Sequence, residues 1–198
     1  MKTITKTLLA ISLSAMTAFS MPAMAAAPAA SGQTFGVVDM NQVLQSTDAA
    51  KSIFKQMDAR RKRYQAEISK AENSLRASEE ELQKQKDTLS KSAFEDKQKA
   101  IEEKVIEGQK MVQNRRQILD QAFSTAMNSL RHSAAQIVAH IAKEKHYSAV
   151  FTDQAVMMSM PDMDMTKDVI DQMNKKVKSI SVDWKKASKD VDAMSPSR

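Results

Sequence analysis

The feature that most constrains the fold of this 198-residue chain is a stretch over 54–141 that contains no proline and a single glycine. Its apolar and small residues recur at alternating steps of three and four, the pattern of a left-handed coiled-coil seam. At ~1.5 Å per residue, a helix over 54–89 is roughly 50 Å long. The expected seam of this first helix comprises Phe54, Met57, Arg61, Tyr64, Ile68, Ala71, Leu75, Ser78, Leu82, Gln85 and Leu89.

The seam breaks near residues 90–92, where Ser92 followed by Glu95 has the sequence of a capping box and predicts a second helix. Between Arg115 and Met127 its steps are all four, a stutter that unwinds a supercoil locally and changes the apolar face. No third long helix is available to cover the other faces. We therefore predict an antiparallel coiled-coil hairpin over 51–145. The second stripe comprises Phe94, Gln98, Ile101, Val105, Gly108, Val112, Arg115, Leu119, Phe123, Met127, Leu130, Ala134, Ile137 and Ile141.

The flanks of the hairpin have β-type composition and predict three short strands within 34–40, 146–152 and 155–159. Asp39 or Asn41 is a suitable cap for a brief helix through Leu44. The first long helix has Thr47 or Asp48 as a suitable cap, and a closing helix over 167–178 has Thr166. So few short elements bury too little apolar area to be stable alone. We therefore predict that 34–50 and 146–178 form an oligomerisation body shared between identical chains. Its expected core residues are Val37, Val38, Val150, Phe151 and Val156.

The first 25 residues have the sequence of a secretory signal. Lys2 and Lys6 precede an apolar run over 8–19, and Ala23-Met24-Ala25 supplies small residues for cleavage after Ala25. This predicts export to the periplasm. Residues 26–33 are expected to form a flexible lead-in. Residues 179–198, which contain the only tryptophan, are expected to be a polar, frayed tail.

Positive charge is concentrated on the predicted hairpin. Residues 51–145 contain 20 basic and 14 acidic residues. One interpretation is a solvated coiled-coil face; the other is a surface that attracts polyanions, anionic lipid head groups or acidic unfolded chains. Nucleic acid is a poor candidate, because no recognition motif is present and export removes the chain from that compartment. The densest basic positions are Arg60, Arg61, Lys62, Arg63, Lys84, Lys86, Arg115 and Arg116.

The sequence offers little catalytic chemistry. It has no cysteine, and two of its three histidines, His132 and His140, lie too far apart on one helix to share a metal ion. No nucleophile motif or phosphate-binding glycine loop is present. We predict neither an enzyme nor a cofactor. Five methionines within 157–165 would suit Cu(I), but the favoured interpretation is a strand end followed by a loop packed against the body.

Several segments resemble the Skp (OmpH-like) family of periplasmic chaperones of Gram-negative bacteria, over roughly 35–178. The most specific resemblance is in two segments. The end of Tyr147–Val156 is similar to the family's "V-D-x-x-A-V" turn, and 161–170 is similar to its "D-I-T-x-x-V" helix start. The opening strand, Val37-Val38-Asp39-Met40, also fits. Thr152 and Met165 depart from the family pattern, and the family usually ends near the closing helix.

The resemblance implies an α+β fold in which a helical hairpin projects from a small β body shared between the subunits of a homotrimer. It also implies an ATP-independent holdase that encloses unfolded outer-membrane β-barrel proteins between the hairpins. Met111 and Val112, beside a basic rim, would suit such client contact. Some members carry a proposed lipopolysaccharide site, for which Arg115 and Arg116 are candidates. The alternative hypothesis is a structural or adaptor coiled coil that binds anionic envelope surfaces and holds no client.

Overall fold

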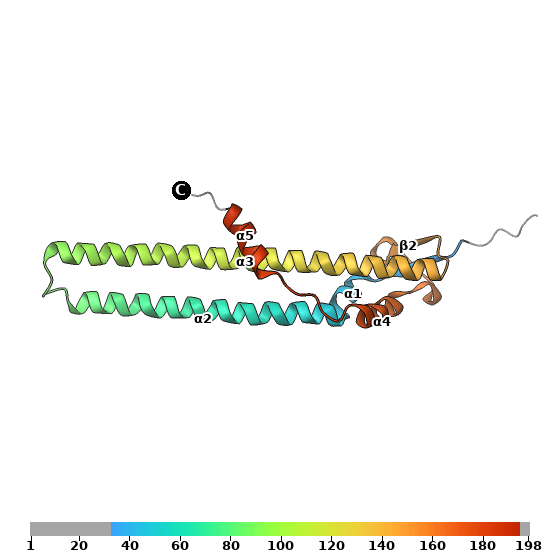
Figure 1. The fold of residues 1–198 in the computed structure, drawn as a ribbon, viewed down its shortest axis with the longest axis horizontal. Helices are drawn as coiled ribbons and strands as arrows, with labels where there is room; N and C mark the ends of the chain where they lie inside the picture. Colours follow the sequence, from blue (N-terminus) through green and yellow to red (C-terminus); the bar gives the residue numbers. More distant parts are fainter. Residues whose placement is uncertain (1–32, 195–198) are drawn as a thin grey trace, which may run out of the picture. The chain divides into compact units, whose positions relative to one another are not determined.

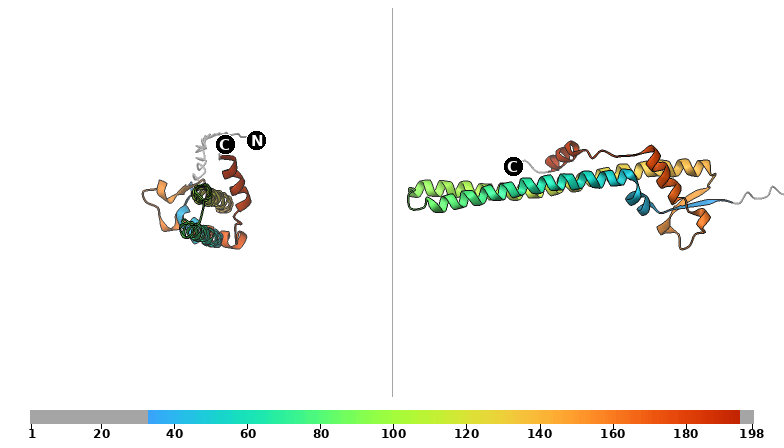
Figure 2. Two further views of the ribbon diagram at one scale, coloured as in Figure 1. Left: turned by 90° about the vertical axis from the view of Figure 1, so that its left-hand side faces the viewer. Right: turned by 90° about the horizontal axis from the view of Figure 1, so that it is seen from below.

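The computed structural model describes residues 33–194, in which two long antiparallel helices form a hairpin (Figure 1). These are α2 (Asp48–Lys84) and α3 (Lys91–Glu144). A small body lies where α2 begins and α3 ends, and the hairpin projects from it (Figure 2). The predicted helical hairpin with a small β part is thereby confirmed. The other elements are β1 (Phe35–Val38), α1 (Met40–Ser46), β2 (Ala149–Thr152), 3-10 turns η1 (Asp153–Ala155) and η2 (Pro161–Met163), α4 (Thr166–Lys176) and α5 (Trp184–Met194).

Side-chain caps set the starts of the first three helices. Asp39 accepts a hydrogen bond from the Gln42 amide at 2.9 Å and begins α1, and Thr47 accepts from the Ala50 amide at 3.4 Å and begins α2. These two predicted caps are confirmed. The predicted cap at Ser92 is wrong, because Ser90 accepts from the Ala93 amide at 3.3 Å and begins α3 two residues earlier. The turn accordingly occupies 85–90 rather than 90–92.

The chain leaves α3 through a left-handed residue. His146 has φ 55°, a value that histidine tolerates better than branched residues do. The amides of His146 and Tyr147 donate to the carbonyls of Lys143 at 3.3 Å and Ala142 at 2.9 Å, which is the Schellman pattern of helix termination. The reversal directs β2 alongside β1. The two strands pair in parallel, from Phe35 opposite Ala149 to Val38 opposite Thr152.

The predicted third strand over 155–159 is wrong for the single chain. Within residues 33–194 the sheet has two strands, and η1 follows β2 directly. The free edge of β1 is met instead by a later segment: Val37 bridges Asp164, and the Met165 amide donates to the Val37 carbonyl at 2.9 Å. Over the described residues, 156–160 pair with no strand.

The core lies in the body and the adjoining half of the hairpin. There the buried face of α2 includes Ile53, whereas the predicted seam residues Phe54 and Arg61 are exposed. These two assignments are wrong because this part of α2 packs against several elements, so its buried face follows the ordinary helical period rather than a narrow coiled-coil seam. The largest fully buried side chains are Ile53, Ile118, Leu130, Met165, Met173, Val43, Val169 and Thr47.

The expected frayed tail is also wrong over 179–194, because it contains α5, which packs against α3. Trp184, Ala187 and Val191 recur at helical spacing, and the latter two are buried. Asp183 accepts a hydrogen bond from the Lys186 amide at 2.9 Å at the start of this helix. The signal sequence and nearly all of the predicted lead-in, residues 1–32, lie outside the described residues, as do 195–198. Over 33–194, none of the helices combines the length and apolarity needed to cross a membrane.

Candidate functional site

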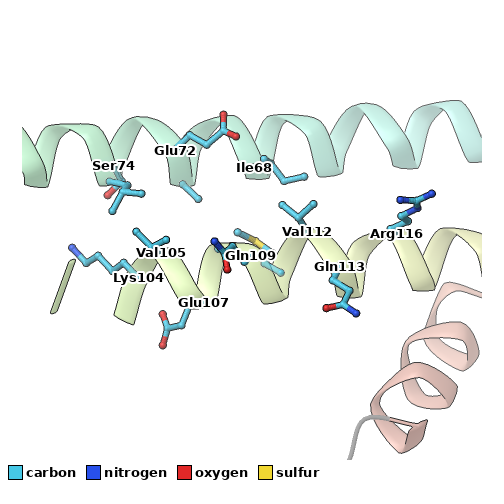
Figure 3. A pocket seen from close by; sticks show the side chains of 14 residues that line it. Ile68, Glu72, Ser74, Lys104, Val105, Glu107, Gln109, Val112, Gln113 and Arg116 are labelled. Atoms are coloured by element: carbon cyan, nitrogen blue, oxygen red, sulfur yellow. The ribbon is translucent and has the colours of Figure 1, made fainter. Parts of the chain in front are cut away.

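The outer half of the hairpin is loosely packed. Between Tyr64 and Leu82 no residue of α2 is buried, and none of α3 is buried before Ile118. A hollow of about 880 Å³ lies between the two helices in this region (Figure 3). Gly108 contributes to it, because a Cβ added there would meet nothing within 4 Å. Its lining residues are Ile68, Ala71, Glu72, Ser74, Leu75, Lys104, Val105, Glu107, Gly108, Gln109, Met111, Val112, Gln113 and Arg116.

Apolar side chains occupy the inside of this hollow and polar ones its edges. Ile68 points from α2 toward α3, and Val105 and Val112 point back, whereas Glu107 and Gln113 point away (Figure 3). Val112 remains 45% exposed. The hollow therefore offers water-accessible apolar surface between two helices, and its contacts are non-directional. Apolar groups of different shapes can contact such a surface, because it demands no single geometry.

The basic residues named from the sequence fall into two groups. Arg61, Lys62, Arg63, Lys84, Lys86 and Arg116 are exposed. Arg60 and Arg115 are half-buried and engaged: Arg115 forms an ion pair with Glu67 at 3.1 Å and lies over the Tyr64 ring at 4.7 Å. Arg60 lies over the Tyr64 ring at 5.6 Å and over the Trp184 ring at 4.5 Å. The exposed group gives the hairpin a basic rim, and the engaged pair fastens helices together.

In the body, the residues expected at the oligomer contact differ in burial. Val37 and Val38 are buried within the chain, and Val150 is half-buried. Phe151 is 44% exposed, although its ring lies 5.8 Å from that of Phe35. Val156, half-buried, begins the unpaired segment over 156–160. The body thus leaves apolar side chains of β2 and of this segment uncovered.

The methionine-rich loop differs from its predicted packing. Met157, Met158 and Met160 are exposed by 105%, 83% and 62%, so they neither end a strand nor pack on the body of this chain. Met165 alone is fully buried, and Met163 is half-buried. Over 33–194, no group of three or more histidine, cysteine or acidic side chains is placed to hold a metal ion.

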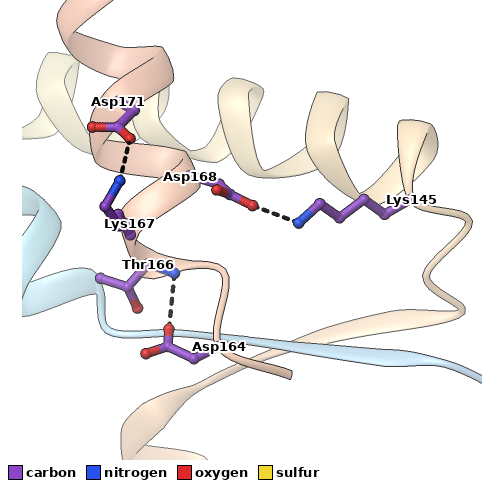
Figure 4. A network of polar contacts seen from close by, with 6 residues as sticks. All are labelled: Lys145, Asp164, Thr166, Lys167, Asp168 and Asp171. Atoms are coloured by element: carbon purple, nitrogen blue, oxygen red, sulfur yellow. Dashed lines mark hydrogen bonds and ion pairs between the residues drawn. The ribbon is translucent and has the colours of Figure 1, made fainter. Parts of the chain in front are cut away.

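An ion pair joins the end of the hairpin to the body, and further polar contacts lie within the body (Figure 4). Lys145, at the end of α3, forms an ion pair with Asp168 of α4, and the hydrogen bond to that carboxylate raises the pKa of Lys145. Lys167 bonds Asp171 at 3.0 Å, which raises the pKa of Lys167. The predicted cap at Thr166 is wrong: Asp164 accepts from the Thr166 amide at 2.8 Å, while the Thr166 hydroxyl accepts from the Asp39 amide at 2.9 Å.

Two residues that hold the helices together, Trp184 and Glu67, were not identified from the sequence. The predicted frayed tail includes Trp184, although the spacing from Trp184 to Ala187 and Val191 indicates an amphipathic helix. Glu67, the partner of Arg115, was not singled out, because a partner on a facing helix depends on the register of the hairpin. The hollow itself has one sequence signal, which is the glycine inside a long helix.

A family model described as outer membrane protein (OmpH-like) matches residues 34–173. Comparison with solved structures finds a candidate outer membrane chaperone (OmpH-like) from Caulobacter crescentus, with a TM-score of 0.73 and 17% sequence identity. The match covers 76% of this chain and 89% of that chain. At this identity it shows a shared fold. Comparison with curated proteins gives no match.

Proposed function

The chain belongs to the outer membrane protein (OmpH-like) family, and from this premise we propose that it is a periplasmic, ATP-independent holdase chaperone. Its clients are unfolded outer-membrane β-barrel proteins. The observation that carries the proposal is the open hollow of the outer hairpin, where apolar side chains from two helices stay accessible to water. An unfolded chain exposes apolar strands that aggregate unless they are covered, and a dispersed apolar surface covers them by many weak contacts.

The charge of the hairpin fits the same activity. The exposed cations of the hairpin, of which Arg116 lines the hollow, attract acidic segments at long range, while apolar contact in the hollow holds them at short range. Anionic lipid or lipopolysaccharide is a further partner of the exposed cations. Met111 lines the hollow, and its flexible side chain adapts to different client side chains.

The proposed working form is a homotrimer assembled through the body. A two-stranded sheet is marginal by itself, and β2 with the segment 156–160 leaves apolar side chains uncovered. A second copy is the simplest source of a pairing strand and of apolar cover. Three hairpins around one axis would then surround the client.

The test uses the mature chain, purified and mixed with a urea-denatured outer-membrane β-barrel protein that is diluted into buffer. Light scattering follows aggregation. We expect suppression at one trimer per client without nucleotide. Undiminished aggregation at that ratio would overturn the holdase proposal and leave a coiled coil that binds anionic surfaces.

A further inference from the structure

Four side chains are stacked in series near the middle of the hairpin, where α5 lies against it (Figure 1), and they join three helices. Trp184 of α5 lies against Arg60 of α2 at 4.5 Å, and Arg60 lies against Tyr64 at 5.6 Å. Arg115 of α3 lies over the same tyrosine at 4.7 Å. A guanidinium over an aromatic ring is attracted by the negative face of the ring. The series therefore alternates cation and ring from α5 to α3.

The inner part of this series is rigidly held. Tyr64 is only 6% exposed, and Glu67 holds Arg115 at 3.1 Å. Arg60 therefore rests on the buried ring of Tyr64, which belongs to the same helix, α2. The second ring, Trp184, comes from α5, outside the hairpin. A planar guanidinium recognises aromatic faces as well as carboxylates, and the group that fills this position here is an aromatic ring.

The outer part of the series belongs to a helix with little stability of its own. α5 has 11 residues, fewer than the ~12–15 that an isolated helix needs to be stable in water. Lys185 and Lys186 lie in its first turn, where the helix dipole disfavours positive charge. Its buried side chains, Ala187 and Val191, are small. α5 therefore docks on α3 through small buried side chains and an exposed hydrogen bond from Asn114 to Asp192 at 3.4 Å, and the stack of Trp184 on Arg60 adds a contact to α2.

The segment before α5 is anchored separately. Gln56 donates to the Ile180 carbonyl at 2.8 Å and accepts from the Val182 amide at 3.1 Å. Release of α5 therefore leaves this segment attached, and Trp184 stays near Arg60 at high effective concentration. A tethered ring of this kind competes with any ring that arrives from another molecule.

We propose that Arg60 and Tyr64 form a capture site for aromatic side chains of an unfolded client, and that Trp184 occupies it as a displaceable substitute. The inference rests on the proposed function and specifies a chemical class of client residue. Strands of outer-membrane barrels carry girdles of aromatic residues. Tyrosine, tryptophan and phenylalanine all offer a ring face, so the site selects aromatic over aliphatic segments without selecting a sequence.

The only tryptophan of the chain reports directly on its own displacement. The probes are a tryptophan-free peptide of alternating tyrosine and threonine and a matched peptide with leucine for tyrosine, each with a fluorescent label for anisotropy. We expect the tyrosine peptide to shift the Trp184 emission to longer wavelength, and the leucine peptide to leave it unchanged. Trp184→Ala and Trp184→Leu should each tighten binding of the tyrosine peptide about three- to tenfold, because a competitor is removed.

Arg60→Ala and Arg63→Ala form the matched pair of controls. Each removes one positive charge, but among residues 33–194 only Arg60 of the two lies over aromatic rings. We expect Arg60→Ala to abolish the preference for the tyrosine peptide and Arg63→Ala to retain it. Equal emission shifts with both peptides, unchanged binding by the Trp184 variants, or equal effects of the two arginine variants would each overturn the inference.

The aggregation assay separates this inference from the proposed function. Suppression of barrel aggregation without an aromatic preference means that the capture site is wrong and the holdase stands. An aromatic preference without suppression means that the capture site is right and the holdase proposal is wrong.

Discussion

At the scale of single residues, the two described glycines occupy opposite surroundings. Gly108 is inside α3 and faces open space, whereas a Cβ at Gly36 would lie 2.9 Å from the Met165 sulfur and 3.0 Å from the Tyr147 ring. At position 108 a larger side chain would fit without a clash, whereas at position 36 only glycine avoids one. This contrast gives a prediction that depends on packing alone.

We expect Gly108→Ala to stabilise the protein by about 0.5–1 kcal/mol, because alanine loses less conformational freedom in a helix. Gly36→Ala should destabilise it by about 1–3 kcal/mol, because Met165 is fully buried and cannot move aside freely. Urea denaturation followed by circular dichroism measures both. Destabilisation by Gly108→Ala would contradict the open surroundings of that glycine.

At the scale of elements, the sequence predicts what local periodicity controls. The long helices follow from apolar spacing, and the starts of α1 and α2 follow from Asp39 and Thr47, whose caps bond amides three residues ahead. The error at Ser92 is small, because serine two residues earlier offers the same chemistry. The existence of the long helices and the starts of helices are therefore accessible where each depends on neighbours along the chain.

Elements whose pairing is tertiary were not predictable in the same way. The segment 155–159 has strand composition, but β1 is bridged by Asp164 instead. The exposure of Phe54 depends on which elements pack against α2, and the docking of α5 depends on a ring and a cation over a hundred residues apart in sequence. The hollow around Gly108 likewise reflects two facing helices, and no single stretch of sequence contains it.

The ion pair between α3 and α4 gives a pH-dependent prediction. Its hydrogen bond to Asp168 raises the pKa of Lys145, so the pair stabilises the fold below the ordinary lysine value of 10.5 and is lost as pH rises through the raised pKa. Nearly half of each side chain is exposed, which limits the contribution to about 0.5 kcal/mol. Lys145→Gln should lower the melting temperature slightly at pH 7, and the difference from wild type should disappear at strongly alkaline pH. A difference that persists there would mean that packing, not charge, is lost.

At the scale of the whole molecule, the exposed methionines of the body test the proposed trimer. Met157 and Met158 contribute little to the stability of one chain, because they are exposed in it. If a second copy covers them, Met157→Asp with Met158→Asp should dissociate the trimer while helix content is retained, because charge is costly to bury. Sedimentation velocity measures the assembly. Met194→Asp, at a 71% exposed position on α5, is the control and should remain trimeric. An intact trimer in the double variant would exclude this segment from the contact.

The last prediction concerns long-range attraction by the hairpin. Reversing Arg61, Lys62 and Arg63 to Glu takes the net charge of 51–145 from +6 to 0 and touches only exposed positions. We expect capture of a denatured barrel to slow at low salt, where the screening length is ~30 Å, and the difference from wild type to shrink at physiological salt, where it is ~8 Å. Release should change less, because apolar contacts are insensitive to screening. Reversing Lys175, Lys176 and Lys178, which are exposed on or just after α4, makes the same change in total charge on the body and is the matched control. Stopped-flow rates that fall equally for both variants would assign the attraction to total charge, and rates equal to wild type would leave the basic rim a solvated face.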